Sequence, residues 1–284
     1  MAVQSGTFPC AAAPKFAVAY DFHLPAPACT PPPLFLLVHG FAGEKAHLAG
    51  HAAALARSGC AALNVNMSSL MAPSPAAAQE RNIAQAVGHV QWALAQRGGG
   101  GAPLVDAQRV FLAGHSAGGS VALEAAVALG AAGVAVRGLC LLDGVPWPRT
   151  EQVVARSLFA PATAAAAAAA PLHLLSLRSV PGAWNLKGKM RGALDAAWAG
   201  GGAAASRQSY TDVFIVNSGH ADPINPPQRG FIVSLLGLLG PPRCAAAYAE
   251  LLLAFAAAGG DPRAPPLAEC LQRLASEGVV TLQS

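Results

Sequence analysis

Charged residues are scarce in this sequence of 284 residues. Lysine, arginine, aspartate and glutamate together make up 11% of the chain, whereas hydrophobic residues make up 54%. The 18 basic residues outnumber the 14 acidic ones and give a formal charge of +4, but they are scattered and form no basic run. The sequence therefore gives no support to nucleic-acid binding, which normally needs a basic patch.

Long apolar runs are also missing. No stretch has the about 18 or more strongly apolar residues that a membrane-spanning helix needs, and the alanine tract at 162–170 is too short and too weakly apolar. The N-terminus has neither the charged-then-apolar layout of a secretory signal nor the arginine and serine richness of a transit peptide. We therefore expect no transmembrane segment and an intracellular location by default, while the compartment and the oligomeric state stay open.

The six cysteines form no C-x-x-C pair, which removes the usual sequence signal for a redox or zinc motif. Cys60 and Cys140 lie inside apolar runs typical of strands, and we expect them to be small core residues. A reducing compartment is the default for such a chain. We expect no metal and no organic cofactor.

The strongest positive signal is the segment 109–119, which contains the pattern G-x-S-x-G. An apolar run of strand type, Val110–Ala113, leads into the pattern, and an alanine-rich helical stretch follows it. This strand–turn–helix setting is that of a nucleophile elbow. The turn at Ser116 is so tight that the residues two before and two after it, Gly114 and Gly118, must lack side chains. A glycine-rich chain can produce the pattern by composition alone, but the flanking strand and helix favour a nucleophilic serine.

A second loop with a chemical signature follows the all-apolar run Leu34–Val38, which is typical of a strand covered on both faces. The run ends in His39-Gly40-Phe41, where the glycine lets the backbone turn so that the N–H of Phe41 can face the nucleophile. Together with the N–H of Ala117, it would form a two-donor oxyanion hole. A plain strand-to-helix turn is the alternative.

Strand-type and helix-type segments alternate along most of the chain. The expected strands lie at 16–22, 34–38, 60–65, 110–113, 136–142, 172–177 and 212–216, the last of these being the final strand. The expected helices lie at 47–57, 76–96, 121–129, 228–239, 244–258 and 266–277, and the segment 184–198 is expected to be a loop followed by a helix. This alternation predicts an α/β fold with a mainly parallel, doubly wound sheet and helices on both faces.

We expect a single domain spanning 1–284, with its core at about 34–240 and two C-terminal helices within 244–277. An alanine-rich insertion at about 144–170 interrupts the alternation, either as a disordered segment or as a piece of helix. Three of its large apolar side chains could line a substrate pocket or simply pack, namely Trp147, Leu158 and Phe159.

A serine hydroxyl is a weak nucleophile, so it needs a base, and the base needs an orienting acid. In enzymes with this kind of elbow the order along the chain is serine, acid, histidine. Only His173 and His220 lie far beyond Ser116. His173 is flanked by leucines and is expected to be a satisfied strand residue, whereas His220 follows the final expected strand in a glycine-containing loop. We therefore predict that His220 is the base.

The acid cannot come from its commonest position, the loop after the penultimate strand at 178–185, because no Asp or Glu lies between Glu151 and Asp195. Asp143 ends the strand that follows the elbow helix, next to the nucleophile strand, and is the predicted acid. An aspartate before glycine also commonly caps a loop. Asp195 is the second candidate. Asp222 is too close in sequence to the predicted base to orient its ring and is expected to fix the loop instead.

Four blocks of the sequence carry these residues: 35–41, 112–119, 141–143 and 219–222. Together they resemble the chlorophyllase branch of the α/β-hydrolase superfamily, and an acid on the strand after the elbow helix agrees with that branch. The resemblance implies the α/β-hydrolase fold. It also implies hydrolysis of the ester that joins phytol to chlorophyll, which gives chlorophyllide.

These observations combine into one hypothesis: a serine carboxylic-ester hydrolase that acts on a small apolar ester. Ser116 would be the nucleophile, His220 the base and Asp143 the orienting acid. Two alternatives stay open, since a fold hosts many functions. One is a general esterase or lipase of the same fold, and the other is a non-catalytic member that only binds a ligand.

Overall fold

The computed structural model describes residues 1–10, 13–67, 74–147, 149–153, 172–200, 209–225 and 238–283. Within these ranges nine strands form one sheet in the spatial order β1-β2-β4-β3-β5-β6-β7-β8-β9. Their bounds are β1 Ala2–Cys10, β2 Ala13–Leu24, β3 Pro33–Val38, β4 Ala61–Val65, β5 Asp106–His115, β6 Val136–Leu142, β7 His173–Arg178, β8 Ser209–Ile215 and β9 Val280–Gln283. All pairings from β4 to β8 are parallel, and the outer pairings are antiparallel. The predicted mainly parallel sheet is confirmed.

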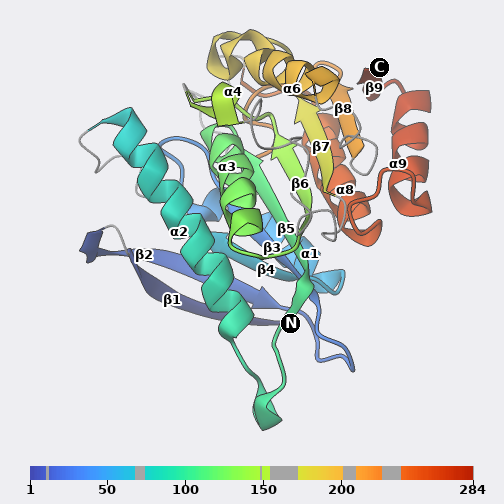
Figure 1. Cartoon of the computed structure of the whole chain (residues 1–284). Helices are drawn as coiled ribbons and strands as arrows, with labels where there is room; N and C mark the ends of the chain where they lie inside the picture. The colour runs from blue at the N-terminus through green and yellow to red at the C-terminus, as the bar shows by residue number, and fades with distance from the viewer. Residues whose placement is uncertain are drawn as a thin grey trace.

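Helices cover both faces of this sheet (Figure 1). The α-helices are α1 Ala49–Arg57, α2 Pro75–Ala95, α3 Ala117–Ala131, α4 Thr150–Val153, α6 Lys189–Gly200, α8 Pro242–Ala257 and α9 Pro265–Ser276. Short 3-10 helices are η1 Lys45–Leu48, η2 Gly99–Gly101 and η4 Ala183–Gly188. Side chains of α2, α3 and α6 pack on one face, and those of α1, α8 and α9 pack on the other. Among the described residues, no helix is long and apolar enough to cross a membrane.

Each central strand contributes to two cores because successive side chains point to opposite faces. In β3, Leu34 and Leu36 pack with α2 and α3, whereas Phe35 packs with α1 and α8. The Phe35 ring stacks on Phe111 of β5 at a centroid distance of 4.7 Å. The rings of Phe111 and of Phe255 from α8 lie nearly perpendicular, with centroids 6.2 Å apart. The all-apolar runs in the sequence are therefore strands buried on both faces.

Two strand predictions differ from the structure. The strand ending at Ile215 is not the last one, because Val280–Gln283 adds β9 antiparallel to β8 at the sheet edge. This strand has four residues and follows α9 after only three residues, so periodicity could not reveal it. The N-terminal strand expected at 16–22 is also longer, since β2 spans Ala13–Leu24. It forms an antiparallel ribbon with β1 and joins the sheet through β4.

The elbow helix begins at Ala117 rather than at Val121, directly after the serine. A short 3-10 turn, Gly99–Gly101, lies between α2 and β5. The helix expected at 228–239 and the alanine tract at 162–170 fall outside, or almost wholly outside, the described residues. Those two predictions stay untested.

Candidate active site

Ser116 occupies the turn between β5 and α3, at the carboxyl edge of the sheet. Its backbone has φ 54° and ψ −127°, a conformation that residues other than glycine rarely adopt. A Cβ on Gly114 would lie 2.2 Å from the carbonyl oxygen of Gly118. A Cβ on Gly118 would lie 2.4 Å from the carbonyl oxygens of Val38 and His39. The first glycine therefore lets the turn close, and the second lets α3 start against the end of β3.

Gly40 brings the loop after β3 against the same turn. A Cβ on Gly40 would lie 2.9 Å from the Cβ of Ser116, so glycine is needed for close approach. The left-handed backbone of this loop falls at Ala42, with φ 53°, rather than at the glycine. Phe41 lies between them. Ala117 is the first residue of α3, so its N–H has no acceptor within the helix. Both expected oxyanion donors thus lie in segments that meet at the serine.

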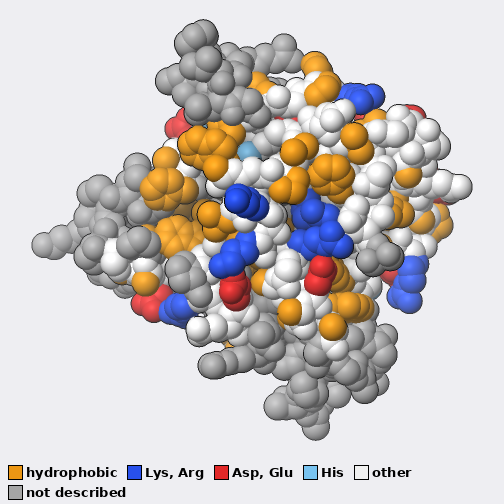
Figure 2. Space-filling model, turned by 90° about the horizontal axis from the view of Figure 1, so that it is seen from above, with side chains coloured by type: hydrophobic (Ala, Val, Ile, Leu, Met, Phe, Trp, Pro, Cys, Tyr) orange, Lys and Arg blue, Asp and Glu red, His pale blue; other side chains and the backbone are white. Residues whose placement is uncertain are grey.

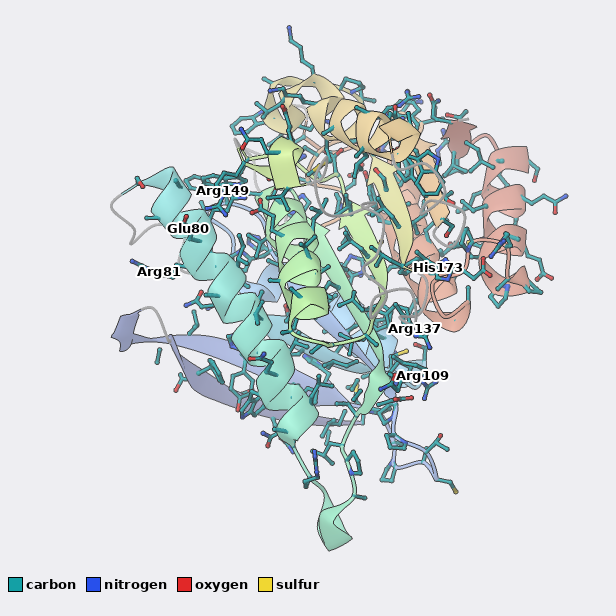
Figure 3. The ribbon with its side chains drawn as sticks, in the orientation of Figure 1. Glu80, Arg81, Arg109, Arg137, Arg149 and His173 are labelled. Atoms are coloured by element: carbon teal, nitrogen blue, oxygen red, sulfur yellow. The ribbon has the colours of Figure 1, made fainter. Side chains whose placement is uncertain are left out.

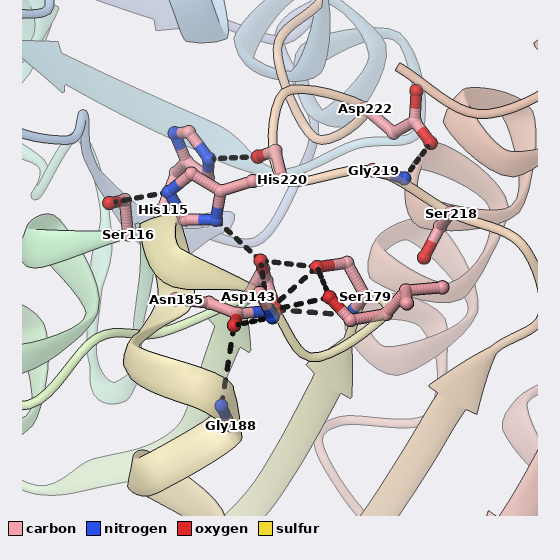
Figure 4. A network of polar contacts seen from close by, with 12 residues as sticks. His115, Ser116, Asp143, Ser179, Asn185, Gly188, Ser218, Gly219, His220 and Asp222 are labelled. Atoms are coloured by element: carbon pink, nitrogen blue, oxygen red, sulfur yellow. Dashed lines mark hydrogen bonds and ion pairs between the residues drawn. The ribbon is translucent and has the colours of Figure 1, made fainter. Parts of the chain in front are cut away.

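Three side chains from separate strand ends form one chain of hydrogen bonds (Figure 4). His220 Nε2 lies 2.9 Å from Ser116 Oγ, and His220 Nδ1 lies 2.5 Å from Asp143 Oδ2. An ionised carboxylate can only accept hydrogen bonds, so Nδ1 carries the proton and Nε2 accepts from the hydroxyl. The structure brings these three predicted residues together because β5, β6 and β8 end at the same edge of the sheet.

The carboxylate of Asp143 is buried and held by the segment that follows β7. Ser179 donates its N–H to Oδ1 at 2.9 Å and its hydroxyl to Oδ2 at 2.6 Å. The Asn185 amide lies 3.4 Å from both carboxylate oxygens. Burial acts to raise the pKa of Asp143, but the hydrogen bond to His220, its charge and the Ser179 donors outweigh burial and hold that pKa below its ordinary value. The carboxylate therefore stays ionised next to the imidazole.

The loop that carries the histidine is fixed on both sides. Asp222 accepts the N–H of Gly219 at 2.8 Å and that of Gly240 at 3.0 Å, which is the loop-fixing role predicted for it. His51 of α1 lies with Nε2 2.8 Å from the carbonyl oxygen of Pro223 and donates to it. These contacts hold the loop in place before any substrate arrives.

His115 links the elbow to this loop. Its Nε2 donates to the carbonyl oxygen of His220 at 2.8 Å, and the two ring centroids are 5.1 Å apart. Burial, followed by the neighbouring His220, lowers the pKa of His115 to about 3, so its ring stays neutral. In the sequence His115 is only a variable position of the elbow pattern, and no local signal points to its contact with a loop far along the chain.

The rejected and second-choice candidates lie elsewhere. His173 begins β7 at the end of the sheet away from the site (Figure 3), and its Nδ1 lies 2.7 Å from Ser209 Oγ. It is a satisfied strand residue, as expected. Asp195 of α6 pairs with Arg191 at 3.0 Å and accepts the hydroxyl of Tyr210 at 3.1 Å. Asp143, not Asp195, is therefore the carboxylate that contacts the histidine ring.

A pocket opens beside the elbow, between the loop after β3 and helices α2 and α3. Its lining residues are His39, Gly40, Phe41, Met67, Gln79, Asn82, Ala117, Gly118, Val121 and Trp147. Both expected oxyanion residues are among them, and the larger apolar side chains form walls suited to an apolar part of a ligand. Trp147 is one of the three side chains expected near a pocket, and the other two fall outside the described residues.

Buried polar contacts tie together the helices around this pocket. The amide of Gln79 donates to Glu124, and the hydroxyl of Thr150 donates to the same carboxylate oxygen at 2.9 Å. Burial raises the pKa of Glu124. On the outside, Arg149 pairs with Glu80 (Figure 3). These contacts join α2, α3 and α4 and hold the walls of the pocket in fixed positions.

Ser179 and Asn185 were not predicted from the sequence. The segment 178–185 contains no carboxylate, and in the structure it supplies hydrogen-bond donors to Asp143 instead. The available signal was a serine and an amide after β7, in the segment where the acid usually lies. Within the described ranges, no group of three or more His, Cys, Asp or Glu residues is placed to hold a metal ion.

An open, mainly parallel sheet with a serine on a strained strand-to-helix turn defines the α/β-hydrolase class of folds. A model of the alpha/beta hydrolase family matches residues 35–283, and the chain belongs to that family. A search of curated proteins found no match.

Solved structures share the whole fold. A ferulic acid esterase from Streptomyces cinnamoneus superposes with a TM-score of 0.65 at 17% identity, over 99% of this chain and 95% of that one. A dienelactone hydrolase-like promiscuous phosphotriesterase from metagenomic libraries superposes with a TM-score of 0.58 at 16% identity, over 99% of both chains. At such identities the likeness establishes the fold.

Proposed function

We propose that this protein hydrolyses carboxylic esters, with Ser116 as nucleophile, His220 as general base and acid, and Asp143 as the orienting carboxylate. The observation that carries the proposal is the unbroken hydrogen-bond chain from Asp143 through His220 to Ser116. The esterase named among the structural neighbours supports the reaction class by analogy.

In the first half of the reaction, Ser116 Oγ attacks the ester carbonyl carbon while its proton moves to His220 Nε2. The carbonyl oxygen becomes an oxyanion, and the N–H groups of Phe41 and Ala117 would stabilise it. Asp143 stabilises the imidazolium that forms. The alcohol then leaves with the proton from Nε2, and the acyl group stays on the serine.

In the second half, water attacks the acyl carbon and gives a proton to His220 Nε2. The carboxylic acid is released when that proton returns to Ser116 Oγ. The protein atoms end as they began, so the reaction needs only the ester and water.

The direct test is hydrolysis of a short p-nitrophenyl ester by the wild type and by Ser116→Ala. Loss of the nucleophile should lower kcat by about a thousandfold or more. Ser276→Ala, which removes an exposed hydroxyl at the end of α9, is the matched control and should keep full activity. A fluorophosphonate should label the wild type and not Ser116→Ala. Turnover that persists in Ser116→Ala would refute the assignment.

A narrower proposal follows from the motif resemblance: the ester is the phytyl ester of chlorophyll. Ala117 stands where the chlorophyllase branch usually has arginine, so this substrate needs its own assay. Release of phytol and chlorophyllide from chlorophyll in detergent would support it. Turnover of simple esters alone would assign a general esterase or lipase, and no turnover with no labelling of Ser116 would assign a ligand-binding member of the family.

A further inference from the structure

Large apolar side chains are exposed around the candidate site. Three of them lie within a few residues of each other after β7: Val180, Trp184 and Leu186 are 48%, 54% and 48% exposed. A fourth, Phe41, is 59% exposed in the loop after β3. Because both segments follow the carboxyl ends of parallel strands, they lie at the edge of the sheet that carries Ser116. Exposed apolar side chains grouped around a site indicate a binding surface.

The segment after β7 holds these side chains outward by its own construction. Asn185 is buried and accepts the N–H of Gly182 at 2.8 Å, while its amide donates to Ser179 Oγ at 3.0 Å. The residues on either side of it, Trp184 and Leu186, point to solvent. Leu186 and the following lysine have left-handed backbones with φ 50° and 57°, which is costly for residues other than glycine. The exposure is therefore built into the segment and is anchored beside the candidate acid.

Basic residues are in excess along the segment from Arg178 to Arg191. Between Glu151 and Asp195 the sequence contains basic residues and no acidic one. Arg178 and Arg191 pair with Asp212, and Lys189, itself 62% exposed, pairs with Glu151. Within the described part of the chain, Lys187 has no ion-pair partner. Looking down on this face, Figure 2 shows basic side chains lying among hydrophobic ones, with acidic side chains against some of them.

We propose that the rim formed by Val180, Trp184, Leu186 and Lys187 docks the protein on a lipid surface that carries anionic headgroups. Apolar side chains flanked by a free ammonium group are the combination that binds such a surface, since the rings and methyl groups enter the acyl boundary and the cation meets the headgroups. Docking would present Ser116 to apolar esters held in the lipid. This use of the surface rests on the proposed ester hydrolysis, but docking itself needs no turnover.

Sedimentation with vesicles tests the apolar part. Wild-type protein should bind vesicles of phosphatidylcholine mixed with phosphatidylglycerol, and the double variant Trp184→Ser, Leu186→Ser should bind about tenfold or more weakly. The matched control is Val3→Ser, Leu282→Ser, which removes two side chains of equal exposure, 48% and 54%, from edge strands. It should bind like the wild type. Thermal melting of each variant establishes that it is folded.

A charge reversal tests the choice of lipid and leaves the apolar side chains in place. Lys187→Glu should weaken binding to the anionic vesicles by about 25-fold, because each unit of charge near such a surface contributes about a factor of five and the reversal changes the charge by two units. Its binding to pure phosphatidylcholine should not change. The control is Arg57→Glu. Arg57 ends α1 at the amino ends of the parallel strands, away from the rim, so this variant should bind as the wild type does.

Three results would overturn the proposal. The wild type could bind neither vesicle, which would leave the rim to a protein partner. It could bind neutral and anionic vesicles with equal affinity. Finally, the rim variants and their control variants could lose affinity for the anionic vesicles to the same extent. Ser116→Ala should bind vesicles like the wild type, because docking needs no turnover. A wild-type protein that docks but hydrolyses no ester would count against the proposed function and not against docking.

Discussion

Asp143 and Ser116 both hold a backbone conformation that their side chains disfavour, with φ 51° and 54°. Each such residue costs about 1–3 kcal/mol and persists only where its surroundings fix it. Backbone bonds do so here: Asp143 donates its N–H to Leu177 at 2.7 Å, and Ser116 donates its N–H to Leu142 at 3.2 Å. In this backbone conformation both side chains face His220 directly after their strands end.

The acid assignment can be tested at this scale with a matched pair. Asp143→Asn keeps the shape but removes the charge that fixes the tautomer of His220 and stabilises its protonated form. We expect kcat to fall by about 10³–10⁴. Asp195→Asn removes a carboxylate of the same kind from α6 and should leave kcat within about twofold. The measurement is steady-state hydrolysis of a p-nitrophenyl ester, and the reverse order of effects would make Asp195 the acid.

At the scale of the element, α3 shows how one helix uses glycine in two ways. Gly118 and Gly119 lie in its first turn, where added Cβ atoms would meet backbone atoms of β3 and of Gly144 at 2.4 Å and 2.9 Å. Gly130 lies near its end, where a Cβ would meet nothing within 4 Å. The first two let the helix start against the sheet, and the third only costs helix stability.

Replacing the two kinds of glycine by alanine should therefore have opposite effects. Gly118→Ala forces α3 away from Val38 and should lower the free energy of unfolding by about 1–3 kcal/mol or more. Gly130→Ala should raise it by about 0.5–1 kcal/mol, because alanine has a smaller entropy cost in a helix. Urea denaturation of the two variants gives both values. Equal effects would mean that the contact at Gly118 relaxes freely.

At the scale of the whole molecule, the fold disfavours the charged form of most of its histidines. Seven of the eight histidines have lowered pKa values, with burial as the first cause in every case. Burial lowers the pKa of His51 and that of His89 to about 4, against an ordinary value of 6.5. The unfolded chain therefore binds more protons than the folded one between these values, and the free energy of unfolding must fall as the pH falls from 6.5 toward 4.

His51→Gln should reduce this acid sensitivity. Glutamine can still donate to the carbonyl of Pro223, but it takes up no proton when the chain unfolds. Each such histidine contributes a slope of up to about 1.4 kcal/mol per pH unit, so the variant should lose about 3 kcal/mol less than the wild type between pH 6.5 and pH 4. Denaturation curves at several pH values measure this, and parallel pH profiles of wild type and variant would contradict it.

The sequence by itself determined the features that depend on local spacing. Alternating apolar runs and helical periodicity predicted a mainly parallel α/β sheet, and the glycines around Ser116 predicted the elbow, because a tight turn limits side chains within a few residues. It also indicated Asp143 and His220, since each follows a strand whose carboxyl end lies on the same edge of the sheet as Ser116. The short β9 was not predicted, because four residues are too few to show a strand periodicity.

Only the tertiary structure decided which groups hold these residues. Ser179 and Asn185 bind Asp143, and His115 binds the loop of His220, through contacts between segments far apart in the chain. Likewise, glycine is needed at position 40 because Ser116 lies close to it in space. The sequence around Gly40 does not indicate this contact. Such contacts depend on the order of strands in the sheet and on the paths of their loops. Both are set by packing of the whole chain, so they became visible only in three dimensions.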